Sequence, residues 1–410
     1  MVRLRRTSLA AALIAAAAAS ATAQSPLPLG PRFAVNLTTL SNQLGPDIAM
    51  APDGRFEVAW TSLHVVGHEV LHRGYTAGGS AGAELALNQF STGDQNGVRL
   101  SMNASGDWAA SWRSVDQFGP TSDLDAIVRR TSSNGAVLEN EHLAQTSSAP
   151  EPEVTAVARH ADDSYLVVWR EALVLAGHRF AANGTSLGGD EILATLDFSA
   201  GFDVAPLPAG RSIVVFQSNV VPDHHLLARF VAADGSAEGF PFPLDEADGV
   251  VKGRPSVAAD AEGGFVVSWD RTNPGEQQVR RFSADGSPIG ATIVVHTSGG
   301  LATSDPDVAA GRDGSFVVLW SLGQTADSRD VVAREYARTG SPAGDAFVVS
   351  VLVGDEESTQ AAEGDGTFAF AWQGPDSSSD GIWGRRYQRR VVFSDGFESD
   401  DLAYWSSALP

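Results

Sequence analysis

Residues 312–320 read RDGSFVVLW, and close variants of this stretch recur along the chain. A turn glycine, Gly314, is followed by β-branched and aromatic residues that end in Trp320. Such a run after a turn is typical of the second strand of a β-hairpin. The aromatic residues that close these stretches are Trp60, Trp112, Trp169, Phe216, Trp269, Trp320 and Trp372, at successive spacings of 47 to 57 residues. So narrow a spread indicates a repeat protein.

Each unit continues through a polar loop into a third strand and a second turn. The third strand carries a basic residue at Arg73, Arg129, His178, Arg229, Arg280, Arg334 and Arg385. A position filled in every unit is expected to hold the repeats together, paired with a carboxylate of a neighbouring strand, rather than to bind a ligand. The closing aromatics are likewise expected to pack between the units.

The seventh unit lacks its last strand, because Val391 stands where the other units have a turn glycine. The missing strand is found at the other end of the chain, where residues 31–37, PRFAVNL, resemble a fourth strand. A strand from the N-terminus that completes the last unit would close a ring and remove the exposed sheet edge. We therefore predict an all-β fold, a seven-bladed β-propeller with four strands per blade. The alternative is a linear β-array, against which the split seventh unit argues.

The pattern G-x-F-V-V-x-W, a polar loop and V-x-R-x-[FY]-x-x-x-G resembles the propeller-type repeats, roughly 50 residues long, of secreted and surface-attached bacterial proteins. The resemblance covers about residues 31–390 and implies fold and secretion, but carries no catalytic signature. Separately, residues 393–405 resemble a short tail, F-x-D-G-F-E-x-x-D followed by tryptophan, found on exported bacterial proteins. That resemblance implies a sorting or processing signal.

The ends of the chain divide it into three expected parts. Arginines precede a short alanine-rich apolar run, and Ala21-Thr22-Ala23 supplies small residues for cleavage, so residues 1–23 are expected to be a signal peptide. Arg5-Arg6 leaves a twin-arginine export signal as an alternative. Residues 24–390 are expected to form the propeller, and residues 391–410 an acidic tail. No other apolar run approaches the length of a membrane span, so an exported protein, extracellular, periplasmic or at the cell surface, is expected.

Composition excludes several classes of site. The chain has 28 Lys+Arg against 50 Asp+Glu, a net charge of −22 and no cysteine. The acidic balance argues against a nucleic-acid partner, because phosphate binding needs a basic field. Without cysteine there is no disulfide, thiolate metal site or cysteine nucleophile.

One stretch, His68-Glu69-Val70-Leu71-His72, has the H-E-x-x-H spacing of zinc proteases. That chemistry needs a helix, which puts both histidines on one side of the metal with the glutamate beside its water. Here the segment aligns with third strands of other units, and a strand separates residues i and i+4 by roughly 13 Å. A zinc protease is thus kept only as a weak alternative.

Ligand contacts are expected where the repeats differ. Trp108 and Trp383 lie outside the register of closing aromatics and are candidates for stacking on a ligand. His224 and His225, in a variable loop, are candidates for ligand binding or proton transfer. Acidic loop residues make calcium the one cofactor with any support, and its weak candidate ligands are Asp245, Asp248, Asp355 and Glu356. An acidic surface that serves only solubility is the competing interpretation.

These observations favour a secreted propeller that recognises a glycan or an extracellular protein through its variable-loop face. A polysaccharide-active hydrolase or lyase on the same scaffold is the alternative, and a structural envelope protein is a third. Charged groups with perturbed pKa in a deep central pocket would favour an enzyme, and a shallow polar surface would favour a binding module.

Overall fold

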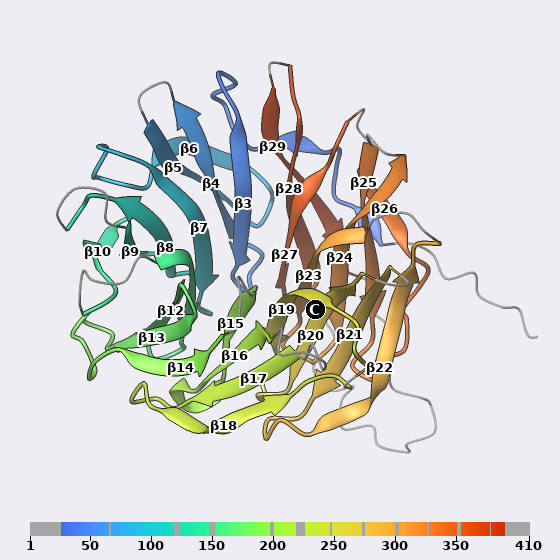
Figure 1. Cartoon of the computed structure of the whole chain (residues 1–410). Helices are drawn as coiled ribbons and strands as arrows, with labels where there is room; N and C mark the ends of the chain where they lie inside the picture. The colour runs from blue at the N-terminus through green and yellow to red at the C-terminus, as the bar shows by residue number, and fades with distance from the viewer. Residues whose placement is uncertain are drawn as a thin grey trace, which may run out of the picture.

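A computed structural model describes residues 26–389, apart from 65–66, 119–123, 147–151, 197–200, 219–225, 247, 273–274, 300–302, 326–327, 351–353 and 378. The expected signal peptide, the expected acidic tail, and the candidates His224 and His225 lie outside the described residues. Seven antiparallel sheets follow one another around a ring, so the predicted seven-bladed β-propeller is confirmed (Figure 1). Blade 1 begins at β3, and blade 7 ends at β29.

In every blade the chain runs from the channel to the rim. The first strands, which line the channel, are β3 (Gln43–Met50), β7 (Gln95–Met102), β11 (Pro152–Arg159), β15 (Phe202–Pro206), β19 (Lys252–Ala259), β23 (Thr303–Ala310) and β27 (Glu357–Gly364). The second strands are β4 (Phe56–His64), β8 (Trp108–Val115), β12 (Tyr165–Glu171), β16 (Ser212–Gln217), β20 (Phe265–Arg271), β24 (Phe316–Thr325) and β28 (Thr367–Pro375).

The outer strands complete the sheets. The third strands are β5 (Gly67–Tyr75), β9 (Leu124–Thr131), β13 (Val174–Phe180), β17 (Leu226–Val231), β21 (Glu276–Phe282), β25 (Ser328–Tyr336) and β29 (Asp380–Gln388). The fourth strands are β6 (Ala81–Ala86), β10 (Val137–Leu143), β14 (Glu191–Thr195), β18 (Ala237–Pro243), β22 (Pro288–Thr297) and β26 (Phe347–Ser350). A three-residue 3-10 turn, η1 (Pro208–Gly210), joins β15 to β16. The described residues include no helix with the length and hydrophobicity that a membrane crossing requires.

The core lies between neighbouring blades. All seven closing aromatics are at most 1% exposed, as predicted. Trp60 of blade 1, for example, belongs to one cluster with Ala362 and Ala371 of blade 7. Truncating a buried aromatic of this size to alanine costs about 3–5 kcal/mol. The repeated tryptophan is therefore explained by blade packing.

The repeated cations of the third strands also join the blades, though not through carboxylates. Arg229 donates to the carbonyl of Leu193 at 2.6 Å, and Arg385 donates to that of Val349 at 2.6 Å. Arg73, Arg129, Arg280 and Arg334 make equivalent bonds to the carbonyls of Val35, Leu87, Leu244 and Val295. The predicted blade-building role is confirmed, but the predicted carboxylate partner is wrong for all six arginines. A main-chain acceptor suffices because the guanidinium lies beside the preceding blade's edge. Of these seven residues, only His178 bonds a carboxylate within the described part of the chain.

The N-terminal segment closes the ring, as predicted from residues 31–37. Regular pairing with β29 is shorter than expected: β2 (Phe33–Ala34) pairs with Trp383 and Gly384, and β1 (Leu27–Pro28) adds a second short contact. Figure 1 shows blade 1, in blue, beside the red strands of blade 7. Val35 accepts from Arg73 as Leu87 accepts from Arg129, so it occupies the fourth-strand position of the last blade.

Candidate functional site

The first strands of all seven blades line a central cavity of about 330 Å³. One residue of each first strand lines this cavity and is defined by its partner in the sheet. That partner is the residue of the second strand that stands just before the closing aromatic. We call these residues the channel ring: Asp47, Arg99, Ala156, Asp203, Ser256, Asp307 and Gln360. Three carboxyl groups and one guanidinium thus meet in a confined, polar space.

Each carboxyl group of the channel ring bonds to the next blade. Asp47 accepts the backbone N–H of Leu100 at 2.6 Å. In the same way Asp203 accepts the N–H of Val257 at 2.8 Å. These bonds satisfy backbone donors that would otherwise be buried without partners. The aspartates therefore have a structural role whether or not they also contact a ligand.

Burial raises the pKa of all three carboxyl groups. The pKa of Asp203 rises to about 6 and that of Asp307 to about 7, and burial also raises the pKa of Asp47. Repulsion from Asp203 and Asp47 adds to the rise at Asp307. A carboxyl group with such a pKa is partly protonated near neutral pH and can then donate a hydrogen bond.

A second set of residues stands two positions before the channel ring, at the channel mouth. These mouth positions are Gly45, Gly97, Val154, Gly201, Arg254, Asp305 and Ser358. They lie at the start of the first strand of each blade. The loops that join the second strand to the third, and the fourth strand to the first strand of the next blade, lie at this same end of the ring. The variable loops of the repeat therefore surround this mouth.

Three mouth positions hold non-glycine residues in a left-handed conformation. The repeat bulges here, and Gly45 and Gly97 take φ values of +53° and +69°. In blades 5, 6 and 7 the same position is occupied by Arg254, Asp305 and Ser358, at φ +22°, +52° and +52°. Such backbone costs of order 1–3 kcal/mol per residue and clusters at functional sites. Blades 5 to 7 keep side chains here although glycine would be less strained.

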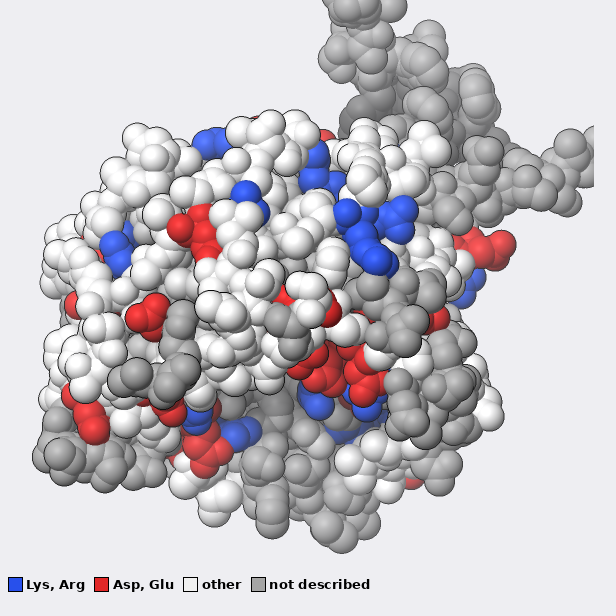
Figure 2. Space-filling view, turned by 90° about the horizontal axis from the view of Figure 1, so that it is seen from above, with Lys and Arg blue, Asp and Glu red and all other residues white. Residues whose placement is uncertain are grey.

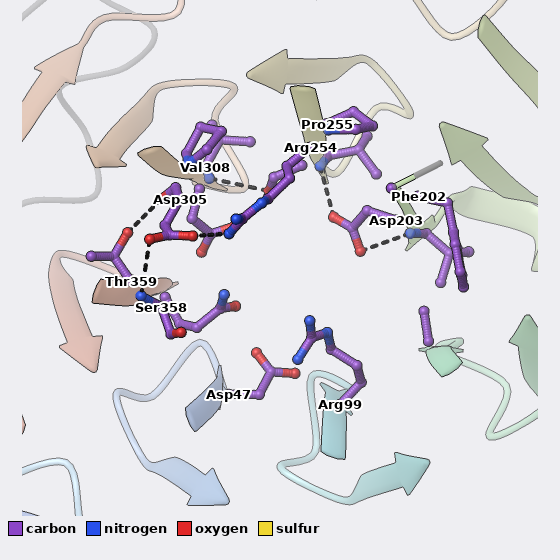
Figure 3. A pocket seen from close by; sticks show the side chains of 18 of the residues that line it. Asp47, Arg99, Phe202, Asp203, Arg254, Pro255, Asp305, Val308, Ser358 and Thr359 are labelled. Atoms are coloured by element: carbon purple, nitrogen blue, oxygen red, sulfur yellow. Dashed lines mark hydrogen bonds and ion pairs between the residues drawn. The ribbon is translucent and has the colours of Figure 1, made fainter. Parts of the chain in front are cut away.

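These strained residues bond to one another (Figure 3). Arg254 forms an ion pair with Asp305. The backbone N–H of Ser358 donates to the Asp305 carboxylate at 3.2 Å, and the hydroxyl of Thr359 donates to the Asp305 carbonyl at 2.6 Å. The Asp305 side chain is 8% exposed, whereas that of Arg254 is 69% exposed. A ligand at the mouth thus meets the guanidinium of Arg254 first, with the carboxylate behind it.

Further charged groups of both signs lie around the mouth. Burial raises the pKa of Asp270, which follows Trp269 on β20, to about 6. Arg170 also lines the cavity. Figure 3 shows the side chains of Asp47 and Arg99, from the neighbouring blades 1 and 2, pointing toward each other. The charged groups at the mouth are suited to hydrogen bonding with a polar ligand. Figure 2 views the rim of the ring, at 90° to Figure 1, and there acidic and basic side chains of the described residues are interspersed among uncharged ones.

The H-E-x-x-H stretch lies on β5, the strand that was predicted for it. His72 Nδ1 is 2.5 Å from Glu57, and its ring packs against Trp108 with centroids 5.2 Å apart. His68 Nδ1 is 3.6 Å from Asp94. The two histidines therefore have separate carboxylate partners. Within the described ranges, no group of three or more His, Cys, Asp or Glu residues could hold a metal ion.

Neither of the predicted stacking tryptophans is among the residues that line the cavity. Trp108 is 3% exposed in the core between blades 1 and 2, which leaves no face of its ring for a ligand. Trp383 is half-buried; its indole N–H donates to the carbonyl of Pro375 at 3.2 Å, and Arg32 lies over its ring. Trp108 is therefore a core residue, whereas a ligand contact at the partly exposed Trp383 stays a prediction.

The four weak calcium candidates lie in two places. Asp245 and Asp248 both bond to Lys252, whose Nζ is 2.7 Å from one carboxylate and 2.6 Å from the other. The ammonium group thus stands where a cation would bind. Glu356 is fully buried and accepts the indole N–H of Trp372 at 2.9 Å, while Asp355 is exposed. The structure does not bring the four together into one site.

Sequence reasoning missed the channel ring and the mouth positions. A signal was present, since Pro46-Asp47 and Pro306-Asp307 each stand 13 residues before a closing aromatic, as does Asp203. An acidic residue at that register faces the channel.

A scan of protein-family models and a search of curated proteins found no match to the chain. Among solved structures, a protein of unknown function from Dyadobacter fermentans is 11% identical, with a TM-score of 0.54 over 89% of this chain and 99% of that one. The polysaccharide lyase Uly1 is 9% identical, with a TM-score of 0.53 over 87% of this chain and 91% of its own. At such identities the likeness is one of fold alone.

Proposed function

We propose that this chain is an exported β-propeller that binds a glycan at the mouth of its central channel. The observation that carries the proposal is the strained, mutually bonded cluster of Arg254, Asp305 and Ser358. It occupies a repeat position where blades 1 and 2 have glycine, so packing alone does not account for it.

A glycan suits the chemistry of this mouth. Sugar hydroxyls both donate and accept, so they can bond a guanidinium and a carboxylate at once. The cavity of about 330 Å³ is at the lower end of small-ligand pockets, and one end of a saccharide chain could enter it. The net charge of −22 disfavours a polyanionic ligand. A neutral or weakly charged saccharide is the ligand class that fits best.

A polysaccharide-active hydrolase or lyase is the second candidate, because several carboxyl groups in different surroundings lie around one channel. The pKa of Asp270 rises to about 6, whereas Asp305 is paired with a guanidinium. A buried carboxyl group with a raised pKa near a second carboxylate is a common feature of catalytic sites. One solved structure with this fold is a polysaccharide lyase, a likeness of fold only. Against this candidate, the Asp203 and Asp307 carboxylates bond backbone N–H groups of neighbouring blades.

The test uses the full mature protein in a glycan-array screen, followed by calorimetric titration of any hit. Arg254→Ala should weaken binding at least about tenfold, since a hydrogen bond to a charged group contributes about 1.5–3 kcal/mol. The matched control is Arg338→Ala, which removes an exposed arginine paired with Glu262 at the turn after β25, the opposite end of the ring.

The same samples are then assayed for new reducing ends and for unsaturated sugar products. Turnover that is lost in Asp270→Asn would favour the enzyme over the binding module. Binding that is equally strong in Arg254→Ala and the wild type would contradict the proposed site. A protein that neither binds nor cleaves any glycan on the array would overturn the proposed function itself.

A further inference from the structure

A serine, a histidine and an aspartate lie in a hydrogen-bonded row on the outer part of blade 3. Ser186 Oγ is 2.6 Å from His178 Nε2, and His178 Nδ1 is 2.7 Å from Asp190 Oδ1. This is the order of contacts that activates a serine nucleophile: hydroxyl, imidazole, carboxylate. The row lies apart from the channel, so its chemistry is independent of the proposed glycan site.

The row is specific to blade 3. His178 stands on β13 at the position where the other six units have arginine. Ser186 stands opposite Phe180 in an isolated β-bridge, and the matching bridge of blade 6 joins Tyr336 to Pro342, which has no hydroxyl. The three residues therefore do not follow from the repeat, unlike the arginine contacts between blades.

Contacts from blade 2 orient the carboxylate. The backbone N–H and the hydroxyl of Thr146 both donate to Asp190, the hydroxyl at 2.7 Å. Burial acts to raise the pKa of Asp190, but the hydrogen bonds from His178 and Thr146 outweigh it and lower the pKa. An ionised Asp190 accepts a hydrogen bond from His178 Nδ1, which leaves Nε2 facing the serine hydroxyl. The Gly188 carbonyl, 3.0 Å from Ser186 Oγ, is a second acceptor for the same hydroxyl in the resting protein.

The serine is accessible while the histidine is enclosed. The His178 side chain is 2% exposed, with its ring 4.6 Å from that of Phe180, whereas Ser186 is exposed. A Cβ added at Gly188 or Gly189 would meet nothing within 4 Å. The two glycines therefore leave the approach to the hydroxyl free of side chains on this side.

We propose that Ser186, His178 and Asp190 form a nucleophilic triad that hydrolyses short-chain carboxylic esters of polar alcohols. Ser186 Oγ bonds to the ester carbonyl carbon while its proton passes to His178 Nε2. The carbon–oxygen bond to the alcohol then breaks, and the alcohol leaves with that proton. Water repeats the sequence on the acyl-serine: its proton goes to His178, the acid is released, and the proton returns to Ser186.

The surroundings define the substrate class. The neighbouring side chains of blade 2 are polar: His142 packs edge-on against Phe180, and the Glu139 carboxylate lies against Gly184. A long acyl chain would find little apolar surface there, whereas an acetyl group and a hydroxyl-bearing alcohol would be accommodated. Ser186 and His178 are the catalytic residues, and Asp190, which acts through His178, is a positioning residue.

The first experiment treats the folded full-length protein with a fluorophosphonate probe, which forms a phosphorus–oxygen bond to an activated serine and expels fluoride. Peptide mapping is expected to find the adduct on Ser186, and hydrolysis of p-nitrophenyl acetate should stop when the adduct forms. Ser186→Ala should abolish both, and Thr185→Ala, which removes the neighbouring exposed hydroxyl, should change neither. An adduct found elsewhere, or none on folded protein, would overturn the proposal.

The second experiment separates catalysis from structure. His178→Arg introduces the residue of the other six units, so folding should be retained, as checked by thermal unfolding. Loss of the general base should nevertheless slow labelling at least about 100-fold. Asp190→Asn should slow labelling, and Asp190→Glu should restore part of the rate. Labelling of His178→Arg at the wild-type rate would show that the row is only a structural network.

Discussion

The carboxylate of Asp307, on the first strand of blade 6, accepts the backbone N–H of Ala361 in blade 7 at 2.6 Å. Its other oxygen accepts the hydroxyl of Ser256 in blade 5 at 2.5 Å. One side chain thus connects three consecutive blades at the channel. The position is buried, and burial raises the pKa of Asp307 to about 7. A residue that joins the ring therefore also makes it sensitive to pH.

Asp307→Asn should reduce the pH dependence of stability. The folded-state pKa, about 7, lies above the ordinary value of 3.8, so the folded protein keeps a proton that the unfolded chain loses. This contribution to the free energy of unfolding is complete below about pH 4, declines as the pH rises to about 7, and stays low above it. For this one carboxyl group the change is at most about 4 kcal/mol.

The measurement is urea unfolding of wild type and Asp307→Asn at pH 5 and pH 8. Comparing the two proteins cancels the titration of all other groups, and the variant should lose less stability between the two pH values. Asp203→Asn, whose carboxyl has a pKa of about 6, should show a smaller difference of the same sign. An identical pH dependence in wild type and Asp307→Asn would show that the carboxyl group stays ionised.

Lys252→Met should destabilise the protein by about 3–5 kcal/mol, because it leaves buried carboxylate charge without its partner. The side chains of Lys252 and Asp245 are each 3% exposed. Arg271→Ala is the control, since Arg271 contacts the more exposed Asp248 at 2.7 Å and should cost less than about 1 kcal/mol. Chemical unfolding measures both, and calcium should not stabilise the wild type through these acids. A Lys252→Met variant as stable as the wild type would contradict the assignment of Lys252 as the partner of these buried carboxylates.

The fold could be predicted because the same pattern of packing residues recurs in seven units of the sequence. The spacing of Trp320 from Gly314 indicates a hairpin, and the absence of a fourth strand after Arg385 indicates where the N-terminal strand belongs. The partner of each arginine could not be predicted in the same way. Every residue has a backbone carbonyl, so the sequence does not show which carbonyl accepts from an arginine. Only Asp and Glu have a side-chain carboxylate, so the residue types favoured a carboxylate partner, which was wrong.

The candidate sites were harder to predict for a different reason. Asp305 and Arg254 are close because adjacent blades bulge at the same register, and no motif spans the 51 residues between them. Trp108, by contrast, had an unusual register but fills space between blades 1 and 2. For His178, the replacement of arginine in one unit was the only sequence signal, and its serine and aspartate partners have no recognisable spacing.

Ser358→Gly should stabilise the protein by about 1 kcal/mol, because glycine adopts φ +52° without the steric cost that serine bears. The backbone N–H that donates to Asp305 is retained. Gly97→Ala is the reciprocal variant: its added Cβ meets no atom within 4 Å, so its expected loss of about 1 kcal/mol reflects backbone strain alone. Thermal unfolding measures both, and a destabilised Ser358→Gly would refute the assignment of strain to the mouth.

Asn36→Ala should destabilise the ring as much as Asn88→Ala does. The Asn36 side chain accepts the backbone N–H of Ile382 at 2.7 Å, and Asn88 accepts that of Val70 at 2.8 Å. Both donors are buried, and a buried N–H without a partner costs about 1–3 kcal/mol. If the N-terminal segment is an integral fourth strand, urea unfolding should give equal losses and one cooperative transition for both variants. A much smaller loss for Asn36→Ala would mean that the N-terminal strand detaches before the ring unfolds.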